Sequence, residues 1–156
     1  FIDDQQNVIG VQGRALDQSN LRYITIMFDE TKPKIFGLDT VDFNKKVYIL
    51  EGPIDSMFVE NSVAMAGSDG DLSQFEASRT VYVYDNEPRN RNIVDKVEKQ
   101  LRSGSSVFIW PDNVGHKDIN DYILAGNSAK DVMKMIEDNT FKSLKGRLRL
   151  NDWKRI

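Results

Sequence analysis

Acidic residues recur at three separate places in the sequence, each time at or just past the end of a short apolar run. They are Glu51 and Asp55, then Asp85 and Glu87, and finally Asp112, Asp118 and Asp121. Carboxylates packed together repel one another unless some stay protonated or a cation lies between them. Oxygen ligands suit hard divalent cations. The pattern therefore predicts a Mg²⁺ site, with Mn²⁺ as a substitute, that would bring substrate phosphates with it.

The apolar runs before these acids have the pattern of buried parallel strands. Val47–Leu50 is an unbroken run that includes β-branched and aromatic residues, which is typical of a strand covered on both faces. Gly52 permits a sharp turn after it, and Pro53 suits the first position of a helix. Glu51 is thereby predicted at the carboxyl end of a central strand, with Asp55 in the first helical turn that follows.

From Lys46 onward, strand-like and helix-like segments alternate, which predicts a doubly wound α/β sheet. We expect strands at 47–50, 62–66, 80–84 and 106–110, and helices at 54–60, 72–77, 88–103, 118–125 and 128–138. The stretch 141–153 fits a helix or a strand. Since the carboxyl ends of parallel strands share one edge of a sheet, the three groups of acids should converge there. The alternative is that each acid merely favours a helix dipole, which requires three coincidences.

The first part of the chain reads as a small β-rich unit. A hairpin is expected within residues 1–16, a third strand at 21–28 and a short helix at 35–43. Arg14, Arg22 and Lys34 are cations spaced through this unit. They either face an anionic ligand or are ordinary surface charges.

The composition is that of a globular domain with a real core. The chain has 156 residues, of which 40% are hydrophobic and 29% charged, which argues against a disordered or fibrous protein. It has no cysteine, which excludes disulfides and cysteine-based zinc sites. No apolar run approaches the roughly 20 residues of a membrane span, so no membrane association and a cytoplasmic location are expected. Because the sequence starts at Phe1 within a strand-like stretch, we expect a piece of a longer protein.

Charge is unevenly distributed along the chain. Residues 140–156 hold six basic side chains against the single acid Asp152, a net charge of +5, which leaves −8 for the rest of the chain. A basic segment beside an acidic body is compatible with a phosphate-backbone contact next to a metal-loaded cleft. The alternative is a solvated helix face.

Several motifs resemble those of a known family. Glu51-Gly-Pro-Ile-Asp55 resembles the first motif of TOPRIM domains, and Asp85-Asn-Glu87 their Asp-x-Asp motif. The stretch 117–123 resembles the Lys-Asp-Pro-Asp-Glu-Tyr-Leu stretch of bacterial replicative primases. Stretches 9–16, 21–24 and 34–38 are similar, in the same order, to elements that precede the TOPRIM domain in those primases. The residues in these stretches are most similar to those of primases of large tailed phages. The order and spacing of the motifs together are more specific for this family than any single motif.

The resemblance implies a fold and an activity. The fold would be a Rossmann-like TOPRIM domain with a four-stranded parallel sheet at 46–127, preceded by a partial polymerase subdomain at 1–45 and followed by a basic helical segment at 128–156. The activity would be RNA primer synthesis on single-stranded DNA, from ribonucleoside triphosphates, for DNA replication in the cytoplasm (the host's, if phage-encoded), with a replicative helicase as partner in a primosome.

The resemblance also implies roles for individual residues. Glu51, with Asp55, would be catalytic, and the metal ligands would be Glu51, Asp85, Glu87 and Asp118. Nucleic acid or nucleotide would meet Arg14, Arg22, Lys34 and Arg89, although surface charge is the plainer interpretation of Arg89. The chemistry fits, because cations can activate a 3′-hydroxyl and stabilise charge on the α-phosphate.

Two positions depart from the family pattern, and other functions stay open. Glu87 replaces an aspartate, which lengthens one ligand arm, and Asn120 stands where a second aspartate is usual, so Asp121 is an alternative ligand. The same acids would also serve a TOPRIM nuclease or topoisomerase, or a non-catalytic metal-dependent nucleic-acid-binding module. Nothing in the chain resembles a zinc-binding template reader or a helicase.

Three further residues invite a functional interpretation. His116 is the only histidine, and in a polar loop it is expected to be a surface group. Trp153 is a candidate for base stacking, with a packing anchor as the plainer alternative. Asp112 would either bind metal or cap a turn.

Overall fold

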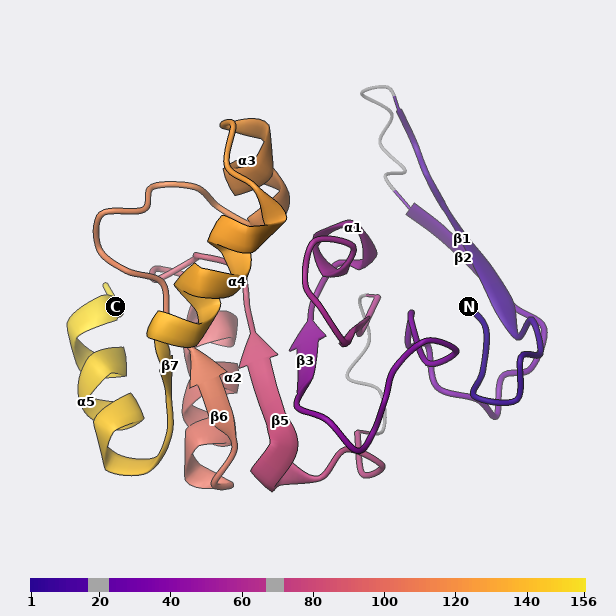
Figure 1. Ribbon diagram of the computed structural model, residues 1–156, viewed down its shortest axis with the longest axis horizontal. Helices are drawn as coiled ribbons and strands as arrows, with labels where there is room; N and C mark the ends of the chain where they lie inside the picture. Colours follow the sequence, from indigo (N-terminus) through magenta and orange to yellow (C-terminus); the bar gives the residue numbers. More distant parts are fainter. Residues whose placement is uncertain (17–22, 67–71) are drawn as a thin grey trace.

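The computed structural model describes residues 1–16, 23–66 and 72–156 (Figure 1). Its main part is a five-stranded sheet with flanking helices, and a separate two-stranded hairpin lies beside it. The sheet strands are β3 (Val47–Leu50), β4 (Ser62–Ala64), β5 (Thr80–Val83), β6 (Ser106–Phe108) and β7 (Thr140–Phe141), and the hairpin strands are β1 (Gly10–Arg14) and β2 (Tyr23–Met27).

The sheet has the order β4-β3-β5-β6-β7. The first four strands in this order run parallel, and β7 pairs antiparallel with β6. From β3 the chain passes outward to β4 and then returns to β5 on the other side of β3, from where it continues to β6. The strand order therefore reverses between β3 and β5, and open α/β sheets bind ligands at the carboxyl ends of strands at such a switch point.

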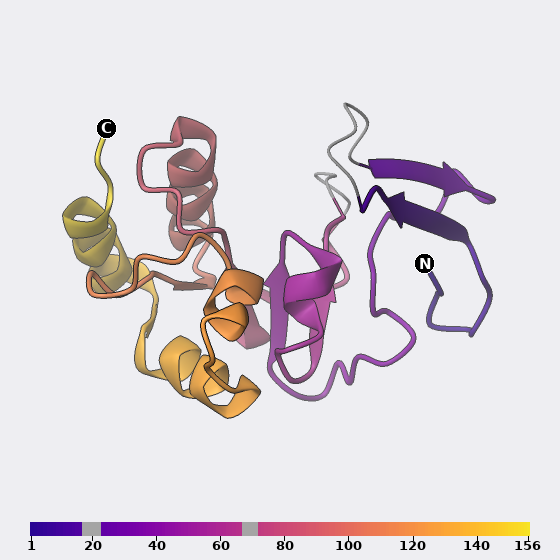
Figure 2. The same cartoon turned by 90° about the horizontal axis from the view of Figure 1, so that it is seen from above.

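Helices cover both faces of the sheet (Figure 2). The helices α2 (Arg91–Arg102) and α5 (Ser143–Trp153) pack together on one side, whereas α3 (Ile119–Leu124) and α4 (Ala129–Asp138) lie on the other, where the short α1 (Pro53–Ser56) contacts α3. A 3₁₀ turn, η1 (Ala77–Arg79), leads into β5. Within the described residues, none of the helices combines the length and the apolar character that crossing a membrane requires.

Local sequence explains the helix boundaries. The stripe of α2 that packs on the sheet consists of the four apolar residues at helical spacing, Ile93, Val94, Val97 and Leu101. Gly104 then adopts φ +87°, a left-handed conformation that suits glycine after a helix. The helix α4 begins with a capping box in which Ser128 and Asp131 bond each other's backbone N–H.

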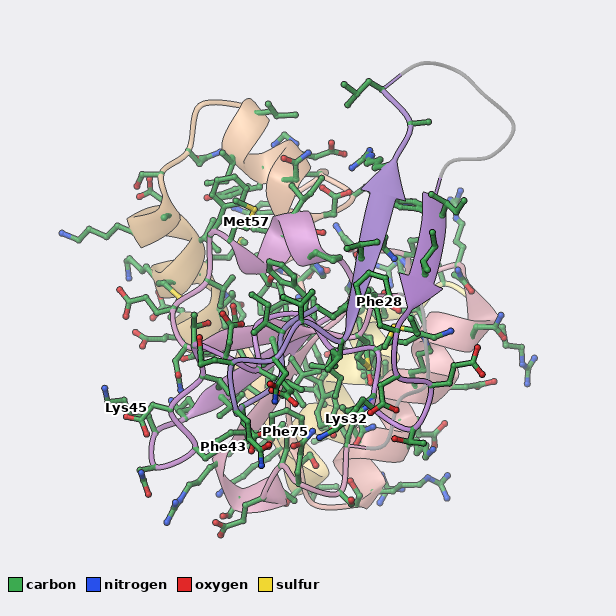
Figure 3. All side chains as sticks on the ribbon, turned by 90° about the vertical axis from the view of Figure 1, so that its right-hand side faces the viewer. Phe28, Lys32, Phe43, Lys45, Met57 and Phe75 are labelled. Atoms are coloured by element: carbon green, nitrogen blue, oxygen red, sulfur yellow. The ribbon has the colours of Figure 1, made fainter. Side chains whose placement is uncertain are left out.

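The hairpin has two different faces. On one face Gln12 bonds Thr25, with 2.9 Å between Nε2 and Oγ1, and the Arg14 guanidinium lies 5.6 Å from the centre of the Tyr23 ring. The opposite face carries exposed apolar side chains, namely Val11, Ile24 and Ile26, with Phe28 just beyond β2 (Figure 3). The hairpin thus adds little to the core, which lies between the five-stranded sheet and its helices.

The four predicted parallel strands are confirmed, and the helix expected from Pro88 forms but begins only at Arg91. Three other expectations are wrong. The stretch 35–43 is not a helix, because Gly37 has φ +90° and Phe36 pairs antiparallel with Ala64 at the edge of β4. The stretch 72–77 is not a helix either; Phe75 is buried in a turn and stacks on Phe43. The helix after β3 spans 53–56 only. Asp71, which precedes the stretch 72–77 and was expected to cap a helix there, lies outside the described residues.

The ambiguous stretch 141–153 contains both kinds of structure. Its first residue belongs to the fifth strand, β7, and the rest forms α5. This helix packs closely on α2. As a result, a Cβ at Gly146 would collide with the side chain of Leu101. Leu150 and Trp153 continue the same buried stripe.

Candidate functional site

Glu51 and Asp85 lie next to each other at the switch point of the sheet. Glu51 follows β3, and Asp85 comes two residues after β5, the neighbouring strand. The Glu51 carboxylate accepts a hydrogen bond from the backbone N–H of Asp85, with 3.3 Å between Oε2 and N. Two carboxylates 34 positions apart in the chain are thereby brought to the same edge of the sheet.

Asp55 lies near the same edge of the sheet, in the turn after β3. Its Oδ1 accepts a hydrogen bond of 2.8 Å from the backbone N–H of Asn120 at the start of α3. The close approach of its carboxylate explains Gly52, because a Cβ at that position would lie only 2.5 Å from Oδ2 of Asp55. Burial raises the pKa of the Asp55 carboxyl above its ordinary value, and the nearby charge of Asp118 adds to this effect.

Asp118 is the N-cap of α3. Its Oδ1 accepts a hydrogen bond of 2.7 Å from the backbone N–H of Asp121. Asp118 also lies close enough to Asp55 and Asp85 to raise the pKa of both. Asp121 itself is exposed in the first turn of the helix.

Glu87 lies at the outer side of the site. Its carboxylate accepts from the side-chain amide of Asn90 and pairs with Lys117, with 3.1 Å between Oε1 and Nζ. These two contacts lower the pKa of Glu87 and so favour its charged form. Asn86, between Asp85 and Glu87 in the sequence, holds the loop after β5 against residues 114–116, because its side-chain amide donates to the carbonyls of Val114 and His116.

Asp85 is the electrostatic centre of the cluster. Burial raises its pKa to about 7, with further contributions from the negative charges of Glu51, Asp55 and Asp118, while Lys117 opposes the rise. Among the described residues, no donor bonds its carboxylate. A half-buried carboxylate surrounded by three others is a position where a divalent cation would relieve strong repulsion.

The donor set fits Mg²⁺ or Mn²⁺, since the acidic side chains that converge supply the carboxylate oxygens that these ions prefer. Their present geometry is not that of a formed metal site: within 1–16, 23–66 and 72–156, no three acidic or histidine side chains are arranged to hold an ion. The reason is visible in the contacts above, because most of the carboxylates are turned toward donors of the protein itself.

Lys96 belongs to the site, although the sequence analysis did not single it out. It projects from α2 and pairs with Glu51, with 3.0 Å between Nζ and Oε1. Its ammonium also lies 6.0 Å from the centre of the Tyr84 ring. The available signal was weak, because one lysine on the polar side of an amphipathic helix resembles any surface charge.

Among the described residues, Arg14 and Lys34 make no contact with the carboxylates of the site. Arg14 lies on the hairpin, stacked on Tyr23, and Lys34 is exposed in the following loop. Arg22 lies outside the described residues. Arg89 is different, because it lines an open groove of about 680 Å³ together with Glu87 and Arg155.

The remaining candidates have structural contacts. Trp153 is buried and donates from Nε1 to Oδ1 of Asn86, with a distance of 3.1 Å, so it anchors α5 to the loop after β5. Asp112 pairs with Arg149 at 3.2 Å, which ties the basic helix to the same edge of the sheet. His116 packs edge-on against Tyr122.

One curated relative is similar to this chain in sequence. The chain is 36% identical over 149 residues to the DNA primase of Enterobacteria phage T4, an alignment that covers 93% of this chain and 43% of the phage protein. The chain thus spans less than half the length of that relative. No protein-family model matches the sequence.

Solved structures share the fold. The zinc-binding and RNA polymerase domains of Aquifex aeolicus primase superpose with a TM-score of 0.65 at 21% identity, over 90% of this chain and 39% of that one. The E. coli primase catalytic core gives 0.62 at 19% identity, over 88% and 50%. A DnaG primase catalytic domain bound to single-stranded DNA gives 0.64 at 19%, over 88% and 49%.

Proposed function

Because this chain is related in sequence to a phage DNA primase and has the fold of bacterial primase catalytic cores, we propose that it forms the acidic part of a primase active site. There it would take part in joining ribonucleotides into short primers on a single-stranded DNA template. The observation that carries the proposal is the convergence of Glu51, Asp55, Asp85 and Asp118 at the switch point of the sheet.

Each carboxylate has a place in this proposal. Glu51 and Asp85 would hold the first divalent cation between β3 and β5, with Asp118 beside it, and Glu87 would hold a cation on the outer side. Glu51, supported by Asp55, is also the candidate for taking up the proton of the attacking hydroxyl. When bound, the cations supply positive charge to the attacking oxygen and the α-phosphate.

Asp55 and Asn120 would keep this arrangement in place. Asp55 bonds the N–H of Asn120 with its side chain, so that the turn after β3 and the start of α3 move as one unit. Asn120 acts through its backbone, which explains why a neutral side chain is tolerated where the family has an acid.

The basic residues would contact phosphates and template. Arg89 lies in the groove beside Glu87, where a triphosphate held by the outer cation would reach it. Arg14, Arg22 and Lys34 would contact the nucleic acid. Ribonucleoside triphosphates, single-stranded DNA, the RNA primer and a replicative helicase are the proposed partners.

The test is template-directed incorporation of ribonucleotides with Mg²⁺ or Mn²⁺. The chain is assayed alone and joined to the remaining part of a related phage primase. We expect Glu51→Gln and Asp85→Asn to reduce incorporation at least about 100-fold, as losses of essential acids do. Glu137→Gln is the matched control, because Glu137 is exposed on α4.

Two outcomes would contradict the proposal. Incorporation that survives both substitutions would exclude these acids as the catalytic site. Metal-dependent nicking of DNA without incorporation would instead favour a nuclease built on the same fold.

A further inference from the structure

Among the described residues, each carboxylate of the site except Asp85 accepts a hydrogen bond or forms an ion pair with another group of the protein. The pairs are Glu51 with Lys96, Asp55 with the N–H of Asn120, Asp118 with the N–H of Asp121, and Glu87 with Asn90 and Lys117. Two of these donors, Lys96 and Lys117, are ammonium groups. They neutralise part of the site when no metal is bound.

The pair of Lys96 with Glu51 is the inner and less exposed of the two. The side chains of Lys96 and Glu51 are 36% and 22% exposed, whereas those of Lys117 and Glu87 are 57% and 29% exposed. The ammonium of Lys96 lies 3.0 Å from Oε1 of Glu51. It therefore lies where a positive charge is most strongly attracted to this carboxylate.

A divalent cation on Glu51 would compete with the Lys96 ammonium for the negative charge of this carboxylate. It would also repel the ammonium, because two positive groups would then share one carboxylate. The long, flexible side chain of lysine allows its ammonium to move away while the helix stays in place.

We propose that Lys96 is a positioning residue that holds Glu51 until the metal arrives and then transfers its ammonium to the phosphates of the nucleotide. The inference rests on the proposed metal site. Metal alone would weaken the pair of Lys96 with Glu51 without giving the ammonium a new partner. Metal bound to a nucleotide would offer phosphate oxygens as that partner. Metal and nucleotide therefore bind with positive coupling. Lys117 has the same role at Glu87, with a smaller effect because its pair is more exposed.

The test compares two binding equilibria by calorimetry. The first is Mn²⁺ alone, and the second is the Mn²⁺ complex of a non-hydrolysable ATP analogue. In Lys96→Met, the repulsion is gone, so Mn²⁺ alone should bind about three- to tenfold more tightly, while the nucleotide complex should bind more weakly by a similar factor. Lys96→Arg keeps the positive charge, so its affinities for Mn²⁺ and for the nucleotide complex should both stay closer to those of the unsubstituted protein.

Controls separate this role from a general effect on folding. Lys134→Met removes a lysine paired with Asp138 on α4 and should change neither equilibrium. In a Glu51→Gln background, Lys96→Met should no longer increase the affinity for Mn²⁺. Each variant is checked by its thermal unfolding midpoint before titration.

The two affinities must move in opposite directions. Affinities that both fall, or a Mn²⁺ affinity that does not rise in Lys96→Met, would overturn the inference. A complete lack of Mn²⁺ binding, with and without Lys96, would instead overturn the proposed metal site on which the inference rests.

Discussion

The carboxylate of Asp55 accepts a hydrogen bond of 2.8 Å from the backbone N–H of Asn120, a residue 65 positions further along the chain. The contact joins the turn after β3 to the first turn of α3. The loop that carries Asp118 is also held at this edge by bonds from Asn86 to the carbonyls of residues 114, 116 and 117 and by the ion pair of Lys117 with Glu87. The Asp55 contact differs from these because it links the loop to the turn after β3, where Glu51 lies.

Gly52→Ala should break this contact. The added Cβ would lie 2.5 Å from Oδ2 of Asp55, which must then move away from Asn120. Loss of the bond and the steric strain should lower the free energy of unfolding by about 1–3 kcal/mol, measured by urea denaturation. Gly115→Ala is the control, because a Cβ there meets nothing within 4 Å. Equal effects of the two substitutions would contradict the argument.

The free energy of unfolding should depend on pH through Asp85. The pKa of Asp85 in the folded protein is about 7, against an ordinary 3.8, so the folded state binds more protons than the unfolded state between these values. The contribution of Asp85 to stability without metal therefore falls as pH rises from about 4 to about 7, and is then constant. The loss is at most about 4 kcal/mol, from 1.36 kcal/mol per pKa unit.

The substitution Asp85→Asn should remove this loss of stability at higher pH. The charges that face Asp85 are Glu51, Asp55, Asp118 and Lys117, and a neutral amide avoids the repulsion of the three acids. In EDTA the variant should be more stable than the unsubstituted protein at about pH 8, with the difference shrinking toward about pH 4. Denaturation curves at several pH values measure it, and identical curves at pH 8 would refute the assignment.

Divalent metal should stabilise the protein, and chelation should reverse the effect. A cation that binds only the folded state at 100 times its Kd adds about 2.7 kcal/mol to the free energy of unfolding. We expect Mn²⁺ to raise the thermal midpoint, more so at pH 8 than at pH 5, because Asp85 must lose its proton to bind metal. Asp85→Asn should lose most of this increase. An equal increase in both proteins would indicate binding elsewhere.

Trp153→Phe should loosen the loop after β5. The substitution removes the donor to Oδ1 of Asn86 and part of a buried ring, which should cost about 1–3 kcal/mol of stability. Hydrogen exchange at the backbone amides of Asn86, Glu87, Arg89 and Asn90 should become faster than in the unsubstituted protein, while exchange within β5 should change less. Leu148→Ala is the control on the same helix, since Leu148 is exposed and should change stability by less than about 0.5 kcal/mol.

Sequence reasoning identified the parts of the fold that depend on local apolar patterns. Val47–Leu50 and Thr80–Val83 are wholly buried, and their unbroken apolar runs predicted them. The stretch 35–43 mixes apolar and polar residues at a spacing that suggested a helix, yet its Phe36 pairs with the edge of β4, a partner that no local pattern reveals. The strand β7 has only two residues, which is too short for any period to be recognised.

The site shows the same division between local and distant information. Glu51, Asp55, Asp85 and Asp118 were identified because a strand end is visible in the sequence and its position in a parallel sheet follows from topology. Lys96 was missed, because its importance comes only from the partner across the sheet edge, Glu51. The backbone role of Asn120 was equally hidden, since any residue type supplies an N–H.

The reversal of strand order between β3 and β5 also affects how such a protein can change over evolution. The loops after these two strands turn away from each other, so each can acquire insertions or new side chains without disturbing the hydrogen bonds of the sheet. A lineage can therefore keep the scaffold and alter the reaction by mutating a few exposed positions. Divergence among descendants should concentrate in the segments that follow Leu50 and Val83, and spare the strands themselves.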